Sequence, residues 1–119
     1  MRTTRRTGDA GERLAAAYLE LTGWTVLERN RRLAGVEVDL VAAEGATRVL
    51  VEVKFRGRWD WGGAAAAVDR AKRERLRRAA RALEQDGVAR VRVDVVAVEL
   101  TADGAIVRHH RNAVQESDH

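Results

Sequence analysis

The strongest pattern in the chain is a two-residue alternation of apolar and polar positions in its central part. Apolar side chains recur at every second position over residues 36–42 and again over residues 49–55. Because successive side chains of a β-strand point to opposite faces of its sheet, this alternation predicts two half-buried strands. Residues 44–47, Glu-Gly-Ala-Thr, lie between the two runs and predict a hairpin turn. Similar patterns predict further strands over residues 24–28, 90–99 and 105–109.

Two stretches have the three-to-four-residue apolar spacing of an amphipathic helix. The first covers residues 10–21, where Asp9 followed three residues later by Glu12 predicts a capping box. Glu12 is also in line with apolar residues of the same helix, so it is equally a candidate to face the protein. The second covers residues 65–85, and Gly87 just beyond it is a typical C-terminal signal.

These elements follow the order α-β-β-β-α-β(-β), which predicts an α/β fold with a mixed β-sheet flanked by helices. A strand, a long helix and a second strand form a right-handed crossover, so we expect the third and fourth strands to be parallel neighbours. We expect one domain over residues 8–113, with a basic arm at residues 1–7 and a disordered tail at residues 114–119.

Composition and charge narrow the class of protein. The chain has 119 residues and no cysteine, which excludes disulfides and thiolate metal sites. No apolar stretch approaches the roughly 20 residues that span a bilayer, so we expect a cytoplasmic protein without a membrane partner. The net charge is +4, and nine basic residues stand against three acidic ones between residues 70 and 92. Such a stripe is typical either of phosphate binding or of a solvated helix face.

The predicted hairpin sets which residues of the two central strands face each other. A two-residue turn places Asp39 opposite Glu52 and Glu37 opposite Lys54, all on one face of the sheet. Opposed residues have Cβ atoms about 4.5–5.5 Å apart, and two carboxylates held that close repel unless a proton or cation lies between them. A divalent ion such as Mg²⁺ suits a small set of hard oxygen ligands. The alternative is an exposed face on which these charges turn into solvent.

Lysine is rare in this arginine-rich chain. Of the 22 basic residues, only Lys54 and Lys72 are lysine. Lysine supplies a compact ammonium on a flexible stem, which arginine does not. Lys54 stands two residues after Glu52, within reach of the same water molecule. Lys72 lies on the inward stripe of the second helix, where we favour a phosphate contact or a link to the carboxylates.

Asp39, followed after twelve residues by Glu52-Val53-Lys54, resembles the D…(D/E)xK signature of restriction-endonuclease-like nucleases. The wider context is similar to the YraN family, small bacterial proteins of that fold related in architecture to archaeal-type Holliday-junction resolvases. The resemblance extends over about residues 8–99 and arguably on to residue 113. It rests on Gly11-Glu12, Glu28-Arg29-Asn30-Arg31, Val36-Glu37-Val38-Asp39-Leu40, Val51-Glu52-Val53-Lys54, Lys72 and Arg92-Val93-Asp94-Val95-Val96.

The resemblance implies a restriction-endonuclease-like fold and metal-dependent hydrolysis of phosphodiester bonds. Asp39, Glu52 and the backbone carbonyl of Val53 would bind Mg²⁺ or Mn²⁺. Lys54 would orient the attacking water and offset charge that develops on the phosphate. Glu12 would approach from the first helix as a further metal or water ligand, an interpretation that competes with its place in a capping box.

Candidate nucleic-acid contacts lie after the third strand and on the second helix. The candidate phosphate contacts are Lys72, Arg73, Arg77, Arg56 and Arg58. Trp59, in a predicted loop over residues 56–67, could stack on a base. It could equally anchor the loop to the core or to a second subunit, which leaves a homodimer open. His109 and His110 would point to opposite faces of their strand, and we expect both at the surface.

Three functions are compatible with these features. The first is a metal-dependent endonuclease acting on nucleic acid, DNA more than RNA, including branched or single-stranded DNA. The second is a non-catalytic nucleic-acid-binding module of the same fold, and the third is an assembly factor whose basic helix docks another protein. The intact set of Asp39, Glu52 and Lys54 favours the first. The chain contains no P-loop, dinucleotide glycine pattern, nucleophile elbow or zinc-ligand spacing typical of other enzyme classes.

Overall fold

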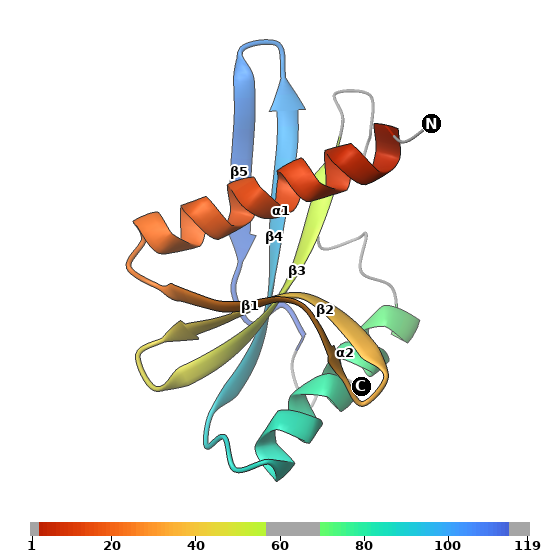
Figure 1. Ribbon diagram of the computed structural model, residues 1–119, viewed down its shortest axis with the longest axis vertical. Helices are drawn as coiled ribbons and strands as arrows, with labels where there is room; N and C mark the ends of the chain where they lie inside the picture. Colours follow the sequence, from red (N-terminus) through yellow and green to blue (C-terminus); the bar gives the residue numbers. More distant parts are fainter. Residues whose placement is uncertain (1–2, 57–69, 115–119) are drawn as a thin grey trace.

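In the described part of the chain, a five-stranded sheet is covered by one helix on each face (Figure 1). The computed structural model describes residues 3–56 and 70–114. The elements are α1 (Thr3–Leu21), β1 (Thr25–Leu33), β2 (Val36–Glu44), β3 (Thr47–Arg56), α2 (Arg70–Gln85), β4 (Val91–Thr101) and β5 (Gly104–His110). The predicted α/β class and the order α-β-β-β-α-β-β are therefore confirmed.

The strands lie in the sheet in the order in which they occur in the chain. β1, β2 and β3 pair antiparallel, β3 and β4 pair parallel, and β4 and β5 form an antiparallel hairpin. The parallel pairing of the third and fourth strands confirms the predicted crossover, since α2 lies between them in the chain.

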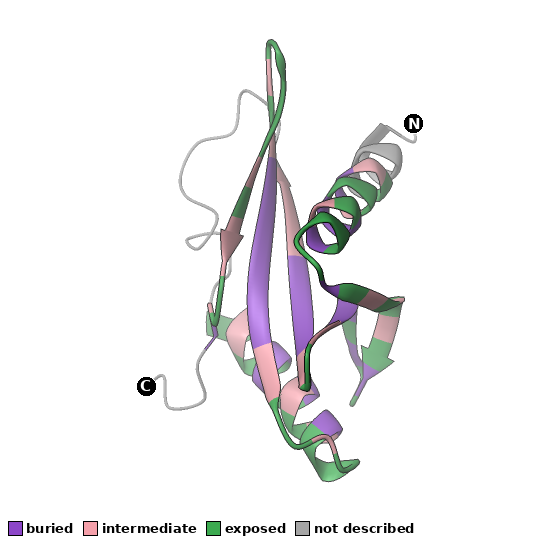
Figure 2. Cartoon of the chain, turned by 90° about the vertical axis from the view of Figure 1, so that its left-hand side faces the viewer, coloured by how far each residue is buried: buried purple, intermediate pink, exposed green. Residues whose placement is uncertain are grey.

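Each face of the sheet has its own apolar core, and the central strands are buried from both sides (Figure 2). The core under α1 contains Ala15, Ala16, Leu19, Trp24, Leu40, Ala42, Val49, Val51, Val96 and Val98. The core under α2 contains Leu33, Val36, Val38, Val41, Leu50, Leu76, Ala79, Leu83, Val93, Val95, Ala97 and Val114. β3 and β4 contribute alternate residues to both cores, which is the expected behaviour of strands covered on both faces.

Two element boundaries differ from those predicted. α1 already begins at Thr3, within the segment expected to be a basic arm, so Asp9 lies inside the helix. The predicted capping box is therefore wrong, because an N-cap must precede the helix. A cap signal is a local preference, and no proline interrupts residues 3–9 to stop the helix from extending. β1 runs on to Leu33, five residues beyond the predicted end.

Some expectations concern residues outside the described part of the chain. Most of the predicted 56–67 loop, the start of the second helix and residues 115–119 of the tail are among them. The predicted end of the second helix at Gln85 is confirmed. Within the ranges 3–56 and 70–114, no helix is long and apolar enough to cross a membrane.

Candidate active site

The central hairpin opens at Asp39. β2 and β3 pair in the predicted register from Glu44–Thr47 as far as Leu40–Val51, and the pairing then ends. At the next position the carboxylate oxygen Oδ2 of Asp39 accepts a hydrogen bond of 2.8 Å from the backbone N–H of Val53. A side chain thus replaces the backbone partner that β3 would otherwise have there. The two strands separate beyond this point, and Figure 1 shows the hairpin opening into a V.

β2 changes face where the hairpin opens. Val38 and Val41 both pack in the core under α2, although residues three apart on a regular strand point to opposite faces. Asn30 on β1, within the pairing opposite this bend, has a left-handed φ of 52°. The expectation that Glu37 faces Lys54 is therefore wrong. Glu37 is turned to the side of α1, where its charge acts on Glu12.

Glu52 is a buried carboxylate, and the described residues engage one of its two oxygens. It is 4% exposed and lies on the α2 side of β3, level with Val95 of β4. Lys72 of α2 places its Nζ 3.0 Å from Oε2. The other oxygen, Oε1, is buried and accepts no hydrogen bond from the described part of the chain. Buried polar atoms are nearly always paired, so an orphaned carboxylate oxygen indicates a place for a missing partner.

Asp39 lies close enough to Glu52 for the two charges to interact strongly. Burial raises the pKa of Asp39 to about 7, with a further contribution from the negative charge of Glu52. The Val53 N–H and the Lys72 ammonium act in the opposite direction without cancelling the effect. A cation between the carboxylates would allow both to ionise at neutral pH.

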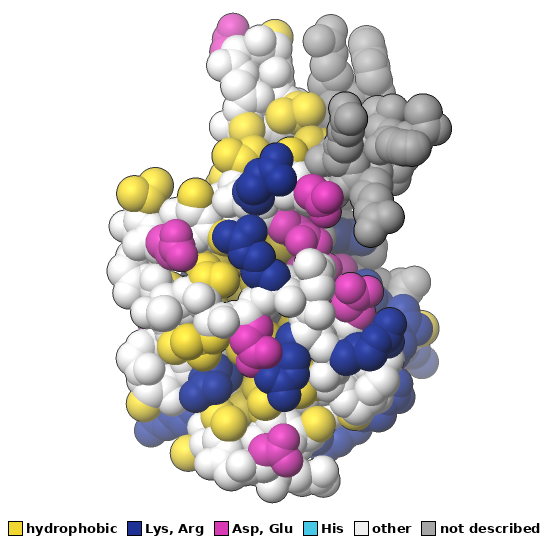
Figure 3. Space-filling view, in the orientation of Figure 1, with side chains coloured by type: hydrophobic (Ala, Val, Ile, Leu, Met, Phe, Trp, Pro, Cys, Tyr) yellow, Lys and Arg dark blue, Asp and Glu magenta, His cyan; other side chains and the backbone are white. Residues whose placement is uncertain are grey.

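Glu12 approaches this pair from the opposite face of the sheet. Its charge also raises the pKa of Asp39, while burial, Asp9 and Glu37 raise the pKa of Glu12 itself. The approach of α1 depends on Gly11, because a Cβ there would lie 2.7 Å from Cδ1 of Phe55 on β3. Figure 3 shows acidic side chains gathered beside the N-terminal half of α1.

Lys54 shares the α2 side of the sheet with Glu52. It pairs in parallel register with Ala97, which lies in the core under α2, and its side chain is half-buried. The predicted common face of Glu52 and Lys54 is confirmed. The Lys54 side chain therefore lies on the same side of the sheet as the Glu52 carboxylate.

The donor set suits a hard divalent cation with few protein ligands. In one strand residue the N–H and C=O point toward the same neighbouring strand, so the Val53 carbonyl faces the gap beside Asp39. Two carboxylates and one carbonyl fit Mg²⁺, which commonly keeps several waters. Over residues 3–56 and 70–114, no group of three or more Asp, Glu or His side chains forms a complete ligand cluster. Glu12 is thus a neighbour of the pair and not part of such a cluster.

The basic residues expected to contact nucleic acid divide into two groups. Arg73 and Arg77 lie on α2, half-buried and buried respectively, and basic side chains gather over this helix in Figure 3. Arg77 pairs through Nη2 with Glu74 at 3.3 Å. Arg56 ends β3, whereas Arg58 and Trp59 lie outside the described residues.

The sequence pattern did not reveal a polar network under α1. Asp94 on β4 is fully buried and accepts hydrogen bonds from Arg92, from His109 and from the backbone N–H of Asn112. His109 Nδ1 lies 3.0 Å from the Tyr18 hydroxyl. A neutral imidazole with its hydrogen on Nε2 can donate to Asp94 and accept from Tyr18.

This network corrects the expectation for the two histidines. His109 is not at the surface, since its side chain is only 8% exposed. His110 pairs with Val95, on the other side of the sheet, so the predicted opposite orientation is confirmed. One signal in the sequence could have indicated this network. Arg92 and Asp94 are two charged residues, two positions apart, in an otherwise apolar strand segment.

Comparison with known proteins assigns the chain to a family. Relatives include UPF0102 proteins from Beutenbergia cavernae, 49% identical over 96% of this chain and 99% of its relative, and from Methylococcus capsulatus, 44% identical over 92% and 90%. Among solved structures, SfsA of Pyrococcus furiosus in complex with Ca²⁺ aligns with a TM-score of 0.41 at 15% identity, over 91% of this chain and 63% of SfsA. The model of the uncharacterised protein family UPF0102 matches residues 11–98. The chain therefore belongs to the UPF0102 family, the YraN family indicated by its sequence motifs.

Proposed function

We propose that the protein is a metal-dependent endonuclease that hydrolyses phosphodiester bonds in nucleic acid, with DNA as the favoured substrate. The observation that carries the proposal is the proximity of the Asp39 and Glu52 carboxylates where β2 and β3 separate. One of these carboxylates has its pKa raised to about 7, and the other keeps a buried oxygen that no described residue engages. Such a pair is costly unless it binds a cation, and perturbed carboxylates of this kind are characteristic of functional sites.

Asp39 and Glu52 are the proposed ligands of Mg²⁺ or Mn²⁺, together with the Val53 carbonyl. The ion would supply a water of lowered pKa and Lewis-acid polarisation of the phosphodiester. Lys54, on the same side of the sheet as Glu52, would orient the water and offset negative charge on the phosphate. Lys72 holds Glu52 in place through its 3.0 Å ion pair. Glu12 is close enough to act on Asp39 and is a candidate to hold a water molecule at the edge of the site.

The basic groups of α2 would bind the substrate backbone. Arg73 and Arg77 follow Lys72 on α2, the helix that covers the same side of the sheet. Arginine forks suit phosphate oxygens, so the strand would lie along this helix. Arg56, Arg58 and Trp59 stay candidate contacts on the segment after β3. The homodimer that the sequence left open stays a prediction.

The decisive experiment is a calorimetric titration with Mn²⁺ and then Mg²⁺, paired with a cleavage assay on single-stranded and branched DNA. We expect Asp39→Ala and Glu52→Gln to lose metal binding and cleavage together. Lys54→Met should keep metal binding and lower turnover by a factor of 10²–10⁴, as removal of a group that acts in the transition state does. Metal binding that survives in both carboxylate variants would remove the proposed site.

A non-catalytic nucleic-acid-binding module is the second candidate. The arginine-rich helix α2 favours it independently of the carboxylates. It would be supported if the wild type bound DNA with a strong salt dependence while neither metal binding nor cleavage could be detected. The same titration therefore separates the two functions.

A further inference from the structure

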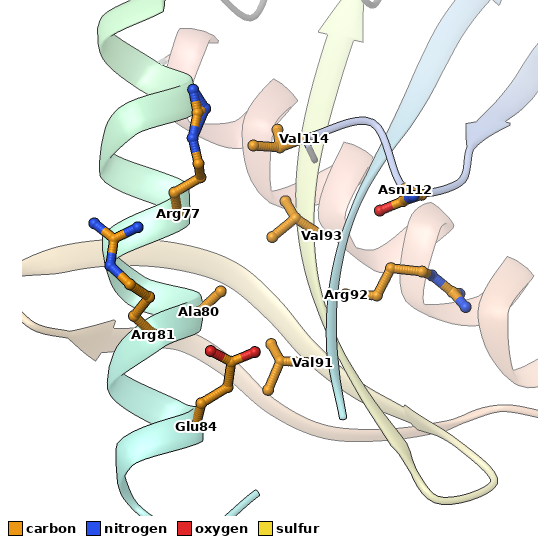
Figure 4. Close-up of a pocket in the computed structure, with 9 residues that line it drawn as sticks. All are labelled: Arg77, Ala80, Arg81, Glu84, Val91, Arg92, Val93, Asn112 and Val114. Atoms are coloured by element: carbon orange, nitrogen blue, oxygen red, sulfur yellow. The ribbon is translucent and has the colours of Figure 1, made fainter. Parts of the chain in front are cut away.

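A cleft lies between α2 and β4, on the same side of the sheet as Glu52. Its volume is about 140 Å³, well above the roughly 10–15 Å³ that a cavity needs to hold one water. Figure 4 shows Ala80 of α2 opposite Val91 and Val93 of β4, with the Arg77 guanidinium extending along the helix toward Val114. Arg81 lines the rim of the cleft, and its guanidinium points away from β4. The cleft thus has an apolar centre with two arginines at its edge.

Arg77 is the unusual residue of this cleft. Its side chain is only 10% exposed, and Glu74 engages Nη2 but not the rest of the guanidinium. Nη1 is buried and donates no hydrogen bond within the described ranges. A buried guanidinium with a free donor is costly, because a buried polar atom without a partner keeps its desolvation penalty. An anionic oxygen is the partner that this geometry lacks.

Among the charged residues that line the cleft, Arg77 and Arg81 are the ones available to bind an anion. Arg92 lines the cleft with its stem, but its guanidinium points away from α2 in Figure 4 and pairs with Asp94 and Glu44. Arg81 is exposed, and it follows Arg77 by four residues, so the two lie on one side of α2. Glu84 lines the opposite end of the cleft, which confines an anion to the Arg77–Arg81 end.

Two independent measures give the distance from this cleft to the candidate active site. Along α2, Arg77 follows Lys72 by five residues, or about 8 Å, and Arg81 follows it by nine residues, or about 14 Å. Along β4, Val93 and Val91 precede Val95, the residue level with Glu52, by about 7 and 13 Å. A nucleic-acid strand advances about 3.4 Å per nucleotide along the helix axis, so these distances span roughly two to four nucleotides.

We propose that this cleft binds one backbone unit of the substrate strand, a phosphate with its sugar, two to four nucleotides from the scissile bond. Arg77 holds the phosphate, the exposed Arg81 turns toward it from the rim of the cleft, and Ala80, Val91 and Val93 pack against the apolar face of the sugar. The proposal rests on the proposed nuclease function for the position of the scissile bond. It goes further in assigning a second, distal phosphate site and a minimum length of strand.

Arg81→Ala is the direct test, with Arg75→Ala as its matched control. Both residues are exposed on α2 and carry the same charge, but Arg75 is six residues away, about 120° around the helix, and does not line the cleft. Binding of a labelled single-stranded 12-mer is measured by anisotropy in EDTA at several salt concentrations. We expect Arg81→Ala to weaken binding five- to tenfold and to reduce the salt slope by about one, while Arg75→Ala changes affinity less than twofold.

Ala80→Leu fills the cleft without changing charge, and it should weaken binding of the 12-mer by a similar factor in protein that melts like the wild type. Inorganic phosphate should shift the amide resonances of Val91 and Val93 in the wild type and not in Arg81→Ala.

Equal losses in Arg81→Ala and Arg75→Ala would overturn the proposal, because binding would then reflect only the general field of the helix. Wild-type affinity in Ala80→Leu would do the same. Resonance shifts caused by hexanoate but not by phosphate would assign the cleft to an apolar carboxylate instead. These measurements contain no divalent metal, so their failure leaves the Asp39–Glu52 site untouched. If the expected losses of DNA binding were seen in a protein that binds no divalent metal, the cleft would serve a non-catalytic nucleic-acid-binding module.

Discussion

Asp39 shows how one side chain can both open a sheet and create a site. Its carboxylate caps the Val53 N–H, which keeps the separated strand β3 from losing a hydrogen bond. The same position buries the carboxylate near Glu52 and raises its pKa to about 7. The burial that would suit the proposed metal site therefore works against the stability of the metal-free fold, a conflict that is typical of functional sites.

Removing the charge of Asp39 should stabilise the metal-free protein. Between about pH 4 and 7 the folded chain keeps a proton on Asp39 that the unfolded chain has released, so stability falls as pH rises through this window. Asp39→Asn keeps an acceptor for Val53 and removes the charge. We expect it to be more stable than the wild type at pH 7.5 by on the order of 1–3 kcal/mol, and equally stable near pH 4. Urea unfolding in EDTA at four pH values measures this.

Mg²⁺ provides the control for that experiment. It should stabilise the wild type at pH 7.5 by binding the folded state, and it should leave Asp39→Asn unchanged. A wild type whose stability does not fall between pH 4 and 7 would show that the two carboxylates are not coupled as the geometry requires.

At the scale of elements, the strand patterns predicted more than the helix signals did. Period-two alternation located β2, β3 and β4 and fixed the hairpin register, because a slip by one residue would turn every apolar side chain to the wrong face. The alternation could not predict the change of face at Asp39. That change depends on a side chain-to-backbone hydrogen bond and on the left-handed Asn30 of the neighbouring strand.

The sequence pointed to a contact of the candidate site but not to the polar network under α1. The rarity of lysine singled out Lys54 and Lys72, and the structure pairs Lys72 with Glu52. The buried state of His109 could not be inferred, because its partners Tyr18 and Asp94 are 91 and 15 residues away in the chain. Contacts of that separation are set by how α1 crosses the sheet.

The position of α1 depends on its close approach at Gly11, and a double-mutant cycle can test this. Gly→Ala inside a helix normally stabilises by about 1 kcal/mol. In this chain the added Cβ would lie 2.7 Å from Phe55 Cδ1 and 3.3 Å from Phe55 Cβ. We therefore expect Gly11→Ala to destabilise the wild type by ~1–2 kcal/mol, an overpacking effect.

Phe55→Ala supplies the other side of that cycle. In its background the clash is absent, so Gly11→Ala should recover the usual stabilising sign. Thermal or urea unfolding of the four proteins gives the coupling energy. Additive effects, with Gly11→Ala stabilising in both backgrounds, would show that Phe55 does not limit the approach of α1.

At the scale of the whole molecule, Asp94 links four separate parts of the described chain through hydrogen bonds. It connects β4 with β5 through His109, with α1 through His109 and Tyr18, and with the end of the described chain through the Asn112 N–H. Trp24 adds an edge contact to the His109 ring, with centroids 5.1 Å apart. A fully satisfied network of this kind fixes one arrangement of its elements.

Asp94 should therefore govern stability in acid. Burial alone would raise its pKa, but hydrogen bonds from Arg92, Asn112 and His109 outweigh burial and lower the pKa below its usual 3.8. The stabilisation is complete above about pH 4 and is lost as pH falls through the lowered value. We expect Asp94→Asn to lose ~2–3 kcal/mol at pH 7 and to show a shallower fall in stability below pH 4 than the wild type.

Glu44→Gln is the matched control, because Glu44 also pairs with Arg92 but lies at the surface. Glu44→Gln should lower the free energy of unfolding much less than Asp94→Asn, and its stability should still fall steeply below pH 4. Urea unfolding from pH 2.5 to 7 compares the three proteins, and near-ultraviolet circular dichroism reports whether the aromatic side chains keep their tertiary packing. If Asp94→Asn kept both the wild-type stability and the wild-type acid slope, the network would be a consequence of the fold and not one of its causes.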